Sequence, residues 1–205
     1  MMREILGGLK RWSLNVIVAG LWIYFACLNV NAYLHLGDFA FLLFTISQGE
    51  FALLVLARRP AKETTHAFSD YVIAGLGTFL VFFYSPTVVL GPLHVIGDVL
   101  IYAAALLDIL GFVFLNRSAG IVPSNRGIKT AGPYGFVRHP IYLSSLLLYV
   151  GYVILSPSVL NGVILAAAAF FQVWRIRNEE RLLGRDPEYV KYGEKVRWRL
   201  VPGVW

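Results

Sequence analysis

Charge is scarce in this chain, and long stretches carry no Lys or Arg at all. Only 15% of the 205 residues are charged and 58% are hydrophobic, whereas a soluble domain has roughly 25% charged residues. The stretches without Lys or Arg cover residues 12–57, 63–116 and 139–174. Each is long enough to cross a bilayer and return, because one membrane helix needs about 20 residues. The composition therefore excludes an ordinary soluble domain and predicts a polytopic integral membrane protein.

The chain also has little with which to bind a metal or form a disulfide. Its one cysteine, Cys27, lies in a hydrophobic run, so no disulfide can form within the chain. The four His residues, at positions 35, 66, 94 and 139, lack the short spacings of metal ligands. We therefore expect no metal site.

The 18 Lys and Arg residues fall in four clusters, which run from Arg3 to Arg11, Arg58 to Lys62, Arg117 to Arg138 and Arg175 to Arg199. Lys and Arg flank membrane helices mainly on the cytoplasmic side, so we expect both termini in the cytoplasm. The net charge of +6 could suggest nucleic acid as a partner. Its clustering beside hydrophobic runs instead favours anionic lipid headgroups, and no nucleic-acid partner is expected.

The hydrophobic pattern predicts an all-α bundle of about six membrane helices in one domain, residues 1–205. The N-terminal membrane helices occupy residues 1–115, and residues 116–205 form the half with the functional motifs and a cytoplasmic helical tail. The last two runs are short and are separated by Ser156-Pro157-Ser158, which is typical of a tight hairpin. The expected membrane runs are 13–33, 39–57, 71–90, 95–115, 141–155 and 159–174.

Two acidic residues lie inside the predicted spans, Glu50 in the second and Asp108 in the fourth. Ionisable groups are costly in lipid, and membrane proteins keep them mainly for function. The alternative is that these acids are protonated or paired with a Tyr, Asn or Gln of a neighbouring helix. The sequence leaves both interpretations open.

The longest polar segment between spans, residues 116–140, is rich in Gly and Pro and ends in Arg138-His139-Pro140. Proline suits the first position of a helix, and the residue before it avoids helical geometry. A helix that begins beside Arg and His favours a carboxylate or phosphate ligand. The alternative is a plain helix start at the membrane surface.

A second group of charged residues follows the last hydrophobic run. Arg175 and Glu179 are four residues apart, so they share one helix face, while Glu180 points to a neighbouring surface. The alternative is an ordinary ladder of surface ion pairs. Together with the loop, this group predicts a cytoplasmic pocket that binds a zwitterionic molecule beside a lipidic one.

Three blocks in order, GPYGFVRHPIY, RIRNEERLL and DPEYVKYGEKVRWRLVPGVW, resemble the isoprenylcysteine carboxyl methyltransferase family. That family forms one group of small integral membrane methyltransferases with the phospholipid N-methyltransferases. The resemblance covers about 116–205. It implies S-adenosylmethionine as methyl donor, S-adenosylhomocysteine as product, and a lipophilic or membrane-associated acceptor, most simply the carboxylate of an isoprenylcysteine-like substrate. The short length of the chain suits a protein of a prokaryotic inner membrane.

The resemblance also implies site residues. Arg175 and Glu179 would be catalytic, with Arg175 positioning the acceptor. The chain departs from the family pattern at Ser144, where glycine is frequent, and it lacks the usual Phe-Gly before the tyrosine-rich segment near Asp186. The residues implied in cofactor binding are Arg126, Gly127, Ile128, Lys129, Tyr134, His139, Pro140, Ile141, Tyr142, Glu179 and Glu180.

Two other functions are compatible with the sequence. Membrane reductases of the sterol-reductase type bind NADPH in a similar C-terminal architecture, and Arg126, Lys129 and Arg138 could hold its phosphates. The neighbouring Glu179 and Glu180 oppose this, because carboxylates repel phosphates. A non-enzymatic membrane protein would rely instead on its intramembrane acids. The oligomeric state is left open.

Overall fold

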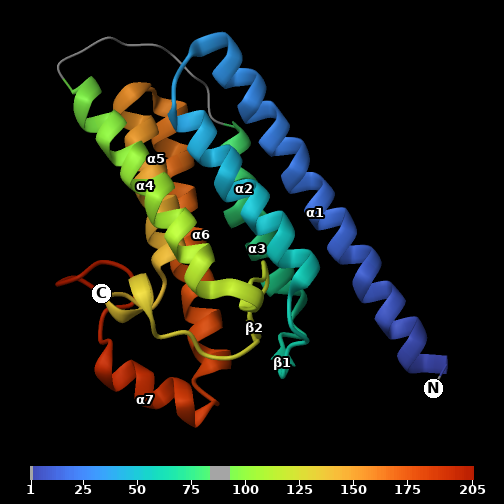
Figure 1. Ribbon diagram of the computed structural model, residues 1–205. Helices are drawn as coiled ribbons and strands as arrows, with labels where there is room; N and C mark the ends of the chain where they lie inside the picture. Colours follow the sequence, from blue (N-terminus) through green and yellow to red (C-terminus); the bar gives the residue numbers. More distant parts are fainter. Residues whose placement is uncertain (1, 84–92) are drawn as a thin grey trace.

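The computed structural model describes residues 2–83 and 93–205, which form a bundle of helices with short loops and one small helix gathered at one end (Figure 1). The predominance of helix confirms the predicted class, and the strands in the described part of the chain are a pair of two-residue antiparallel strands. The elements are α1 (Met2–Leu36), α2 (Ala40–Ala57), β1 (Glu63–Thr64), α3 (Phe68–Phe79), η1 (Leu80–Phe83), α4 (His94–Leu115), η2 (Asn116–Ser118), β2 (Ser124–Asn125), η3 (Gly132–Gly135), α5 (Pro140–Leu155), α6 (Val159–Leu183) and α7 (Pro187–Lys195).

Within the described residues, four helical segments are long and apolar enough to cross a membrane: Trp12–Leu36, Ala40–Ala57, His94–Ser118 and Val159–Leu183. Helix α5 has 16 residues and spans about 24 Å, short of the hydrocarbon core of about 30 Å. The predicted third run, 71–90, is described as far as residue 83. Its remainder lies outside the described residues, as do Ser85, Pro86, Gly91 and Pro92, whose residue types predict a turn. Six membrane crossings therefore remain a prediction.

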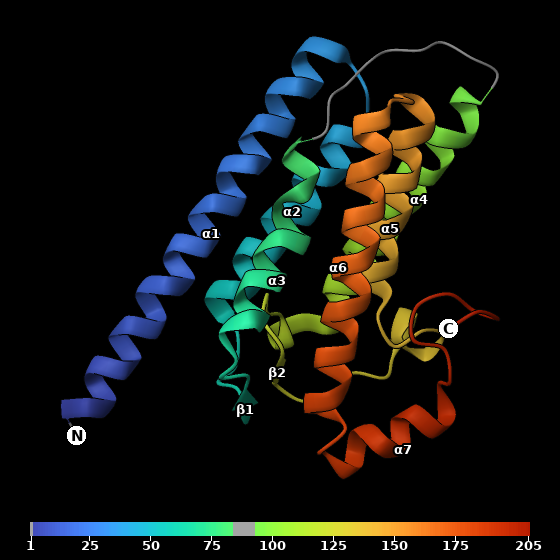
Figure 2. The same ribbon diagram turned by 180° about the vertical axis from the view of Figure 1, so that it is seen from behind.

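The break between α5 and α6 is formed by Ser156 to Ser158, and local hydrogen bonds define it. Ser158 Oγ accepts the backbone N–H of Asn161, 3.1 Å away, and caps α6. The side-chain amide of Asn161 donates to Ser156 O at 2.7 Å. Helix α6 is much the longer of the two and continues past the start of α5 (Figure 2). This extension places the charged side chains of the segment 175–183 among the loops at that end of the bundle.

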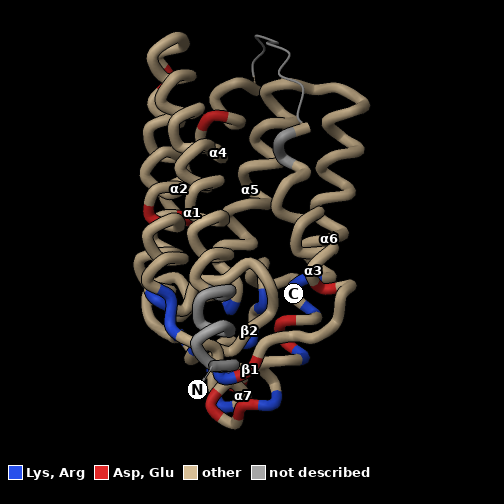
Figure 3. The backbone as a smooth tube through the Cα atoms, turned by 90° about the vertical axis from the view of Figure 1, so that its right-hand side faces the viewer, with Lys and Arg blue, Asp and Glu red and all other residues tan. Residues whose placement is uncertain are grey.

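Lys and Arg gather at one end of the bundle, the end that holds α7, β1 and β2 (Figure 3). We call this the basic end. It comprises α7, the two short strands, the segment 116–139 and the C-terminal part of α6. The opposite end and the middle of the helices are almost free of basic residues. This asymmetry is what the charge clusters predict, and the assignment of the basic end to the cytoplasm stays a prediction.

Glycines allow α4 and α5 to pack with their backbones close together. A Cβ atom on Gly151 would lie 2.8 Å from Ile101 Cγ1 and 3.0 Å from the carbonyl oxygen of Gly97. Small residues at such crossings are typical of membrane helices, where packing rather than hydrophobicity joins the helices. The close approach brings Ser144 of α5 within 2.9 Å of Asp108 on α4.

An aromatic cluster joins α1, α2 and α4. The ring centroids of Trp22 and Phe51 are 4.9 Å apart, and those of Phe51 and Phe112 are 5.0 Å apart. Phe51 and Phe112 are buried together with Val55 and Ala119. This cluster fixes the N-terminal helices against α4 and forms the wall of the cavity described next.

Candidate active site

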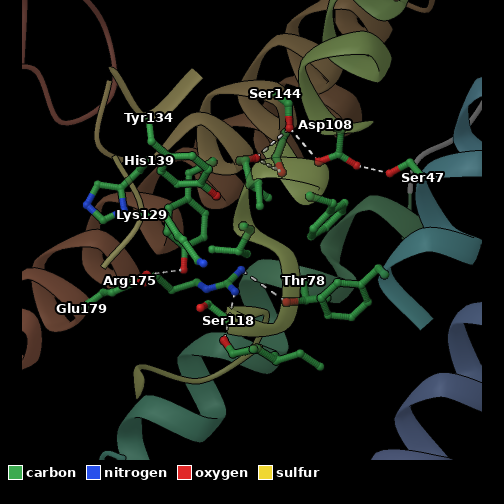
Figure 4. Close-up of a pocket in the computed structure, with 18 of the residues that line it drawn as sticks. Ser47, Thr78, Asp108, Ser118, Lys129, Tyr134, His139, Ser144, Arg175 and Glu179 are labelled. Atoms are coloured by element: carbon green, nitrogen blue, oxygen red, sulfur yellow. Dashed lines mark hydrogen bonds between the residues drawn. The ribbon is translucent and has the colours of Figure 1, made fainter. Parts of the chain in front are cut away.

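A cavity of about 290 Å³ lies between the basic end and the middle of the helix bundle. Residues of each helix from α1 to α7 line it, together with residues of the segment 118–129. Figure 4 shows side chains from several elements pointing into it. It therefore extends from the loops at the basic end to the aromatic wall of α1, α2 and α4.

Most of the residues that the sequence singles out meet at this cavity. Pro140 and Glu180 are outside its lining: Pro140 is buried at the first position of α5, and Glu180 contacts other parts of the protein. The predicted residues that do line the cavity are Arg126, Gly127, Ile128, Lys129, Tyr134, His139, Ile141, Tyr142, Arg175 and Glu179. The structure thus collects side chains from separate segments in one place, and their roles remain predictions.

Arg175 and Glu179 form one wall of the cavity through a shared neighbour, Tyr142. The hydroxyl group of Tyr142 donates a hydrogen bond of 2.9 Å to Glu179 Oε2. The guanidinium carbon of Arg175 lies 4.9 Å from the centre of the Tyr142 ring, a favourable cation–π distance. Tyr142 therefore orients the carboxylate with its polar tip and supports the guanidinium with its face.

The guanidinium of Arg175 is held by Thr78 of α3 and by the backbone of Ile121. Arg175 Nη1 donates to Thr78 Oγ1 at 3.2 Å, and Arg175 Nη2 donates to Ile121 O at 3.1 Å. Its Nε is buried and has no hydrogen-bond partner within the described part of the chain. A Cβ atom on Gly77 would lie 2.9 Å from Arg175 Cδ, so glycine leaves room for the side chain. Thr78 and Gly77 were not predicted as site residues, because their role depends on how the helices pack.

Glu180 occupies the centre of an ion-pair network behind the cavity. Its Oε1 is 2.9 Å from His139 Nε2 and accepts a hydrogen bond of 2.6 Å from the hydroxyl of Tyr189. Its Oε2 accepts from Arg138 Nη1 at 2.7 Å and from Arg199 Nε at 3.3 Å. Consecutive helix residues point about 100° apart, so Glu179 faces the cavity while Glu180 turns from it. Its carboxylate is outside the cavity lining, and the cofactor contact predicted for Glu180 stays a prediction.

The anion expected at the start of α5 is supplied by the protein itself. Both Arg138 and His139 direct their side chains to the carboxylate of Glu180. Their backbone N–H groups donate to Trp198 O and Arg199 O, each at 2.9 Å. The start of α5 is thus joined to α6 and to the C-terminal segment, which fixes the basic end around the cavity.

Helix α7 adds two tyrosines that the sequence analysis did not single out, Tyr189 and Tyr192, and both line the cavity. The hydroxyl of Tyr192 donates a hydrogen bond of 2.6 Å to Tyr134 O. Burial raises the pKa of Tyr192, and it raises the pKa of Tyr134 well above the ordinary value. Both phenols therefore stay neutral donors near pH 7. Their three-residue spacing on an amphipathic helix was the available signal.

A second polar group lies toward the middle of the bundle. Asp108 Oδ1 accepts a hydrogen bond of 2.9 Å from Ser144 Oγ, and its Oδ2 accepts one from Ser47 Oγ. All three line the cavity. The partners of this intramembrane acid are thus serines rather than the Tyr, Asn or Gln considered from sequence. Glu50 is absent from the cavity lining, and its Oε2 has no hydrogen-bond partner within the described residues.

Comparison with known families agrees with this arrangement. Residues 87–186 match the family model of the phospholipid methyltransferases. The match takes in α4, the loop at the basic end, α5 and α6. It confirms the resemblance to the integral membrane methyltransferases related to the isoprenylcysteine carboxyl methyltransferases, and it indicates a methyltransferase of the membrane. No curated protein matches the chain.

Proposed function

We propose that this protein transfers a methyl group from S-adenosylmethionine to a lipophilic acceptor at the cytoplasmic face of the membrane. One observation carries the proposal: a single cavity joins Glu179 and Arg175 at the basic end to an aromatic wall between membrane helices. A polar donor can reach the first part from water, and an acceptor with a hydrophobic tail can occupy the second.

The residues at the basic end fit the methyl donor. S-adenosylmethionine carries an ammonium group, a carboxylate, a sulfonium ion and an adenine ring. Glu179 offers a carboxylate whose Oε2 is held by Tyr142, which suits the cationic groups. Lys129 lines the same cavity and suits the carboxylate, while Ile128 and Leu183 provide apolar surface for the ring.

When bound, the donor supplies an electrophilic methyl group on a positively charged sulfur. The protein contributes orientation and exclusion of water. Glu179 and Tyr142 hold the polar part of the donor, and Arg175 is fixed by Thr78 and Ile121 beside it. Positive charge on sulfur disappears during transfer, so a site with little water favours the step, and fixed geometry supplies much of the rate.

Arg175 would position the polar head of the acceptor. A carboxylate acceptor of the isoprenylcysteine type, which the resemblance implies, could bind through the unpartnered Nε of Arg175. The tail would then extend toward Trp22 and Phe51. Sideways access from the lipid is consistent with the predicted spans on either side of this wall.

The structure disfavours the NADPH-dependent reductase. Of the three cations considered for its phosphates, Arg138 is committed to Glu180 at 2.7 Å. Glu179 lines the same cavity as Arg126 and Lys129, and its carboxylate would repel a phosphate. These contacts favour a donor that carries positive charge.

Calorimetric titration of S-adenosylhomocysteine into the detergent-purified protein tests the proposal. We expect binding to the wild type and at least tenfold weaker binding to Glu179→Ala, because the variant loses the carboxylate at the donor end. Glu194→Ala is the matched control, since Glu194 is exposed on α7 and absent from the cavity lining. Binding of NADPH in place of S-adenosylhomocysteine, or equal binding to Glu179→Ala, would contradict the proposal.

A further inference from the structure

Two strongly exposed hydrophobic side chains lie outside the membrane helices, in segments that meet beside the start of α5. Phe136 directly follows η3 and is 77% exposed, and Val204 lies in the C-terminal segment and is 78% exposed. Neither side chain is part of the cavity lining. The site of the proposed methyl transfer therefore gives them no role, and hydrophobic side chains grouped on a surface mark a place of binding.

Backbone hydrogen bonds hold these two segments together. Arg138 N donates to Trp198 O, and His139 N donates to Arg199 O, each at 2.9 Å. Figures 1 and 2 both show the C-terminal segment beside η3 and the start of α5. Phe136 is two residues from this junction, so the loop after η3 and the C-terminal segment form one surface.

The last residues of that segment, 200–205, fold back on themselves, and we call them the C-terminal turn. Leu200 N donates to Trp205 O at 2.9 Å, which closes the turn. Gly203 has a φ angle of +82°, a conformation in which glycine lets the chain reverse its direction. The exposed side chain of Val204 is therefore presented by a hydrogen-bonded backbone.

The surface lies at the level where a membrane helix ends. The candidate span that contains α4 ends at Ser118. A Cβ atom on Gly132 of η3 would lie 2.5 Å from the ring of Phe114, so η3 packs against the last turn of α4. Val113 of that turn is exposed, as expected for a residue that faces lipid. Phe136 follows η3 directly and extends the lipid-facing surface of α4.

Basic and aromatic side chains accompany the exposed hydrophobic ones. Arg197 is exposed, and the guanidinium carbon of Arg199 lies 5.5 Å from the centre of the Trp205 ring. Trp is enriched at the level of the lipid headgroups, and Arg beside a membrane helix is attracted to anionic lipids. Together with the continuity with α4, this combination favours a lipid surface over a soluble protein as the partner.

We propose that the C-terminal turn and Phe136 form a lipid-binding surface, with Phe136 and Val204 at the start of the acyl chains and Arg197 at the phosphates of anionic lipids. Helix α7 is not part of this surface, because it lies farther from the middle of the bundle than the C-terminal turn (Figures 1 and 2). The inference does not rest on the proposed methyl transfer, since these residues are outside the cavity lining.

Arg199 joins this surface to the centre of the basic end. Its Nε donates to Glu180 Oε2 at 3.3 Å, beside the hydrogen bond from Arg138. Contact of the C-terminal turn with lipid therefore holds the start of α5 and the ion pairs of Glu180 at the membrane surface. The segment that the sequence predicts as a cytoplasmic tail then contacts the membrane again at its end.

Site-directed spin labelling tests the position of the C-terminal turn. Cys27 is the one cysteine of the chain, so Cys27→Ser combined with Val204→Cys allows a single nitroxide label at position 204. The labelled protein is reconstituted in vesicles of phosphatidylcholine and phosphatidylglycerol in equal parts. The accessibility of the label to oxygen, which concentrates in lipid, is compared with its accessibility to a nickel chelate, which stays in water.

Val190→Cys in the same background is the matched control, because Val190 is an exposed valine on α7. We expect the ratio of oxygen to nickel-chelate accessibility to be at least fivefold higher at position 204 than at position 190. Equal ratios at the two positions would overturn the inference. Each labelled protein should keep the thermal midpoint of Cys27→Ser, which shows that it is folded.

A protein partner would give a different result. Low accessibility of position 204 to both reagents would show that protein covers the turn. Dipolar coupling between labels at position 204 of two molecules would identify that protein as a second copy of the chain. Either observation would overturn the assignment to lipid.

Phe136→Ser tests whether the loop after η3 shares this surface. In the protein labelled at position 204, we expect accessibility to the nickel chelate to rise at least twofold, because less apolar surface remains to be buried in lipid. Phe68→Ser is the matched control, since Phe68 is similarly exposed but begins α3, which Figure 1 shows apart from the C-terminal turn. No change in Phe136→Ser, or the same change in both variants, would overturn the shared surface.

Discussion

The charged side chains at the two ends of the cavity differ in the number and charge of their hydrogen-bonding partners. At the basic end, Glu180 has four hydrogen-bonding partners, and the guanidinium of Arg175 is held from two sides. Toward the middle of the bundle, the hydrogen-bonding partners of Asp108 within the described residues are two serine hydroxyls. At the first end, these polar groups are hydrogen-bonded to one another within the protein, without a ligand. The second holds a carboxyl group by two neutral hydroxyl groups from different helices.

One sequence motif can contain two kinds of residue, those that face the cavity and those that hold the surrounding segments together. Glu179 and Glu180 are neighbours in sequence, yet one faces the cavity and the other fixes the helices around it. Removal of Glu180 should therefore damage the structure, while removal of Glu179 should damage binding. Residues around Arg175 should affect turnover, and residues at the outer surface should have the smallest effects.

The largest effect is expected for Glu180→Ala. The variant leaves Arg138, which is only 10% exposed, without its carboxylate, and breaking such a pair costs about 3–5 kcal/mol. The contact with Arg199 contributes less, because that side chain is 39% exposed. We expect a large fall in the thermal midpoint in detergent and loss of S-adenosylhomocysteine binding. Glu179→Ala is the comparison, with a midpoint close to wild type. Equal midpoints for the two variants would refute the division of roles.

Gly132→Ala should destabilise the loop at the basic end. Gly132 has a φ angle of +60°, and an added Cβ atom would lie 2.5 Å from the ring of Phe114. Strain of this kind costs about 1–3 kcal/mol, and the steric clash adds to it. Gly203→Ala is the control, because Gly203 also has a positive φ of +82° but has nothing within 4 Å of the added atom. Thermal unfolding should show the larger loss for Gly132→Ala, and the reverse order would contradict the packing described.

Gly77→Ala should alter catalysis more than donor binding. The added Cβ atom would lie 2.9 Å from Arg175 Cδ and displace that side chain from Thr78. We expect a loss of several fold in methyl transfer with S-adenosylhomocysteine affinity within twofold of wild type. Gly75→Ala lies on the same helix with nothing within 4 Å of its added atom, so its activity should be normal. Similar losses in both variants would show that any added methyl group on α3 lowers activity, and would contradict a specific role for the contact between Gly77 and Arg175.

The smallest effect concerns Asp186, which caps α7 by accepting from Glu188 N at 3.0 Å. A hydrogen bond from the Asn125 side chain, 2.8 Å away, lowers the pKa of Asp186. Its contribution is therefore complete above the ordinary aspartate pKa of about 3.9 and is lost as the pH falls through the lower folded value. Asp186→Asn should flatten the fall of the thermal midpoint at acid pH, and an unchanged pH profile would exclude this role.

Sequence patterns located one end of the cavity better than the other. Most residues predicted from the blocks at 126–142 and 175–180 line it, because each block is short and its helical or loop path is local. Ser47 and Thr78 were not predicted, because their contacts depend on how α2 and α3 pack against distant helices. Helix periodicity correctly places Glu180 on a different surface from Glu179, but the ion-pair partners of Glu180, Arg138 and His139, depend on how distant segments pack.

Helix ends show the same limit. The runs predicted at 13–33 and 95–115 agree closely with Trp12–Leu36 and His94–Leu115. The last run was expected to end at residue 174, but α6 continues to Leu183. The hydrophobic run ends where the charged residues begin, whereas the helix continues because its charged residues bond to Tyr142 of α5, to α7 and to the C-terminal segment.

The most direct test of the account is an experimental structure of the protein with S-adenosylhomocysteine bound. We expect the ligand in the cavity at the basic end, with its amino-acid part in contact with Glu179. The carboxylate of Glu180 should keep its bonds to Arg138 and His139. A ligand bound outside this cavity, or one that contacts Glu180 in place of Glu179, would contradict the account.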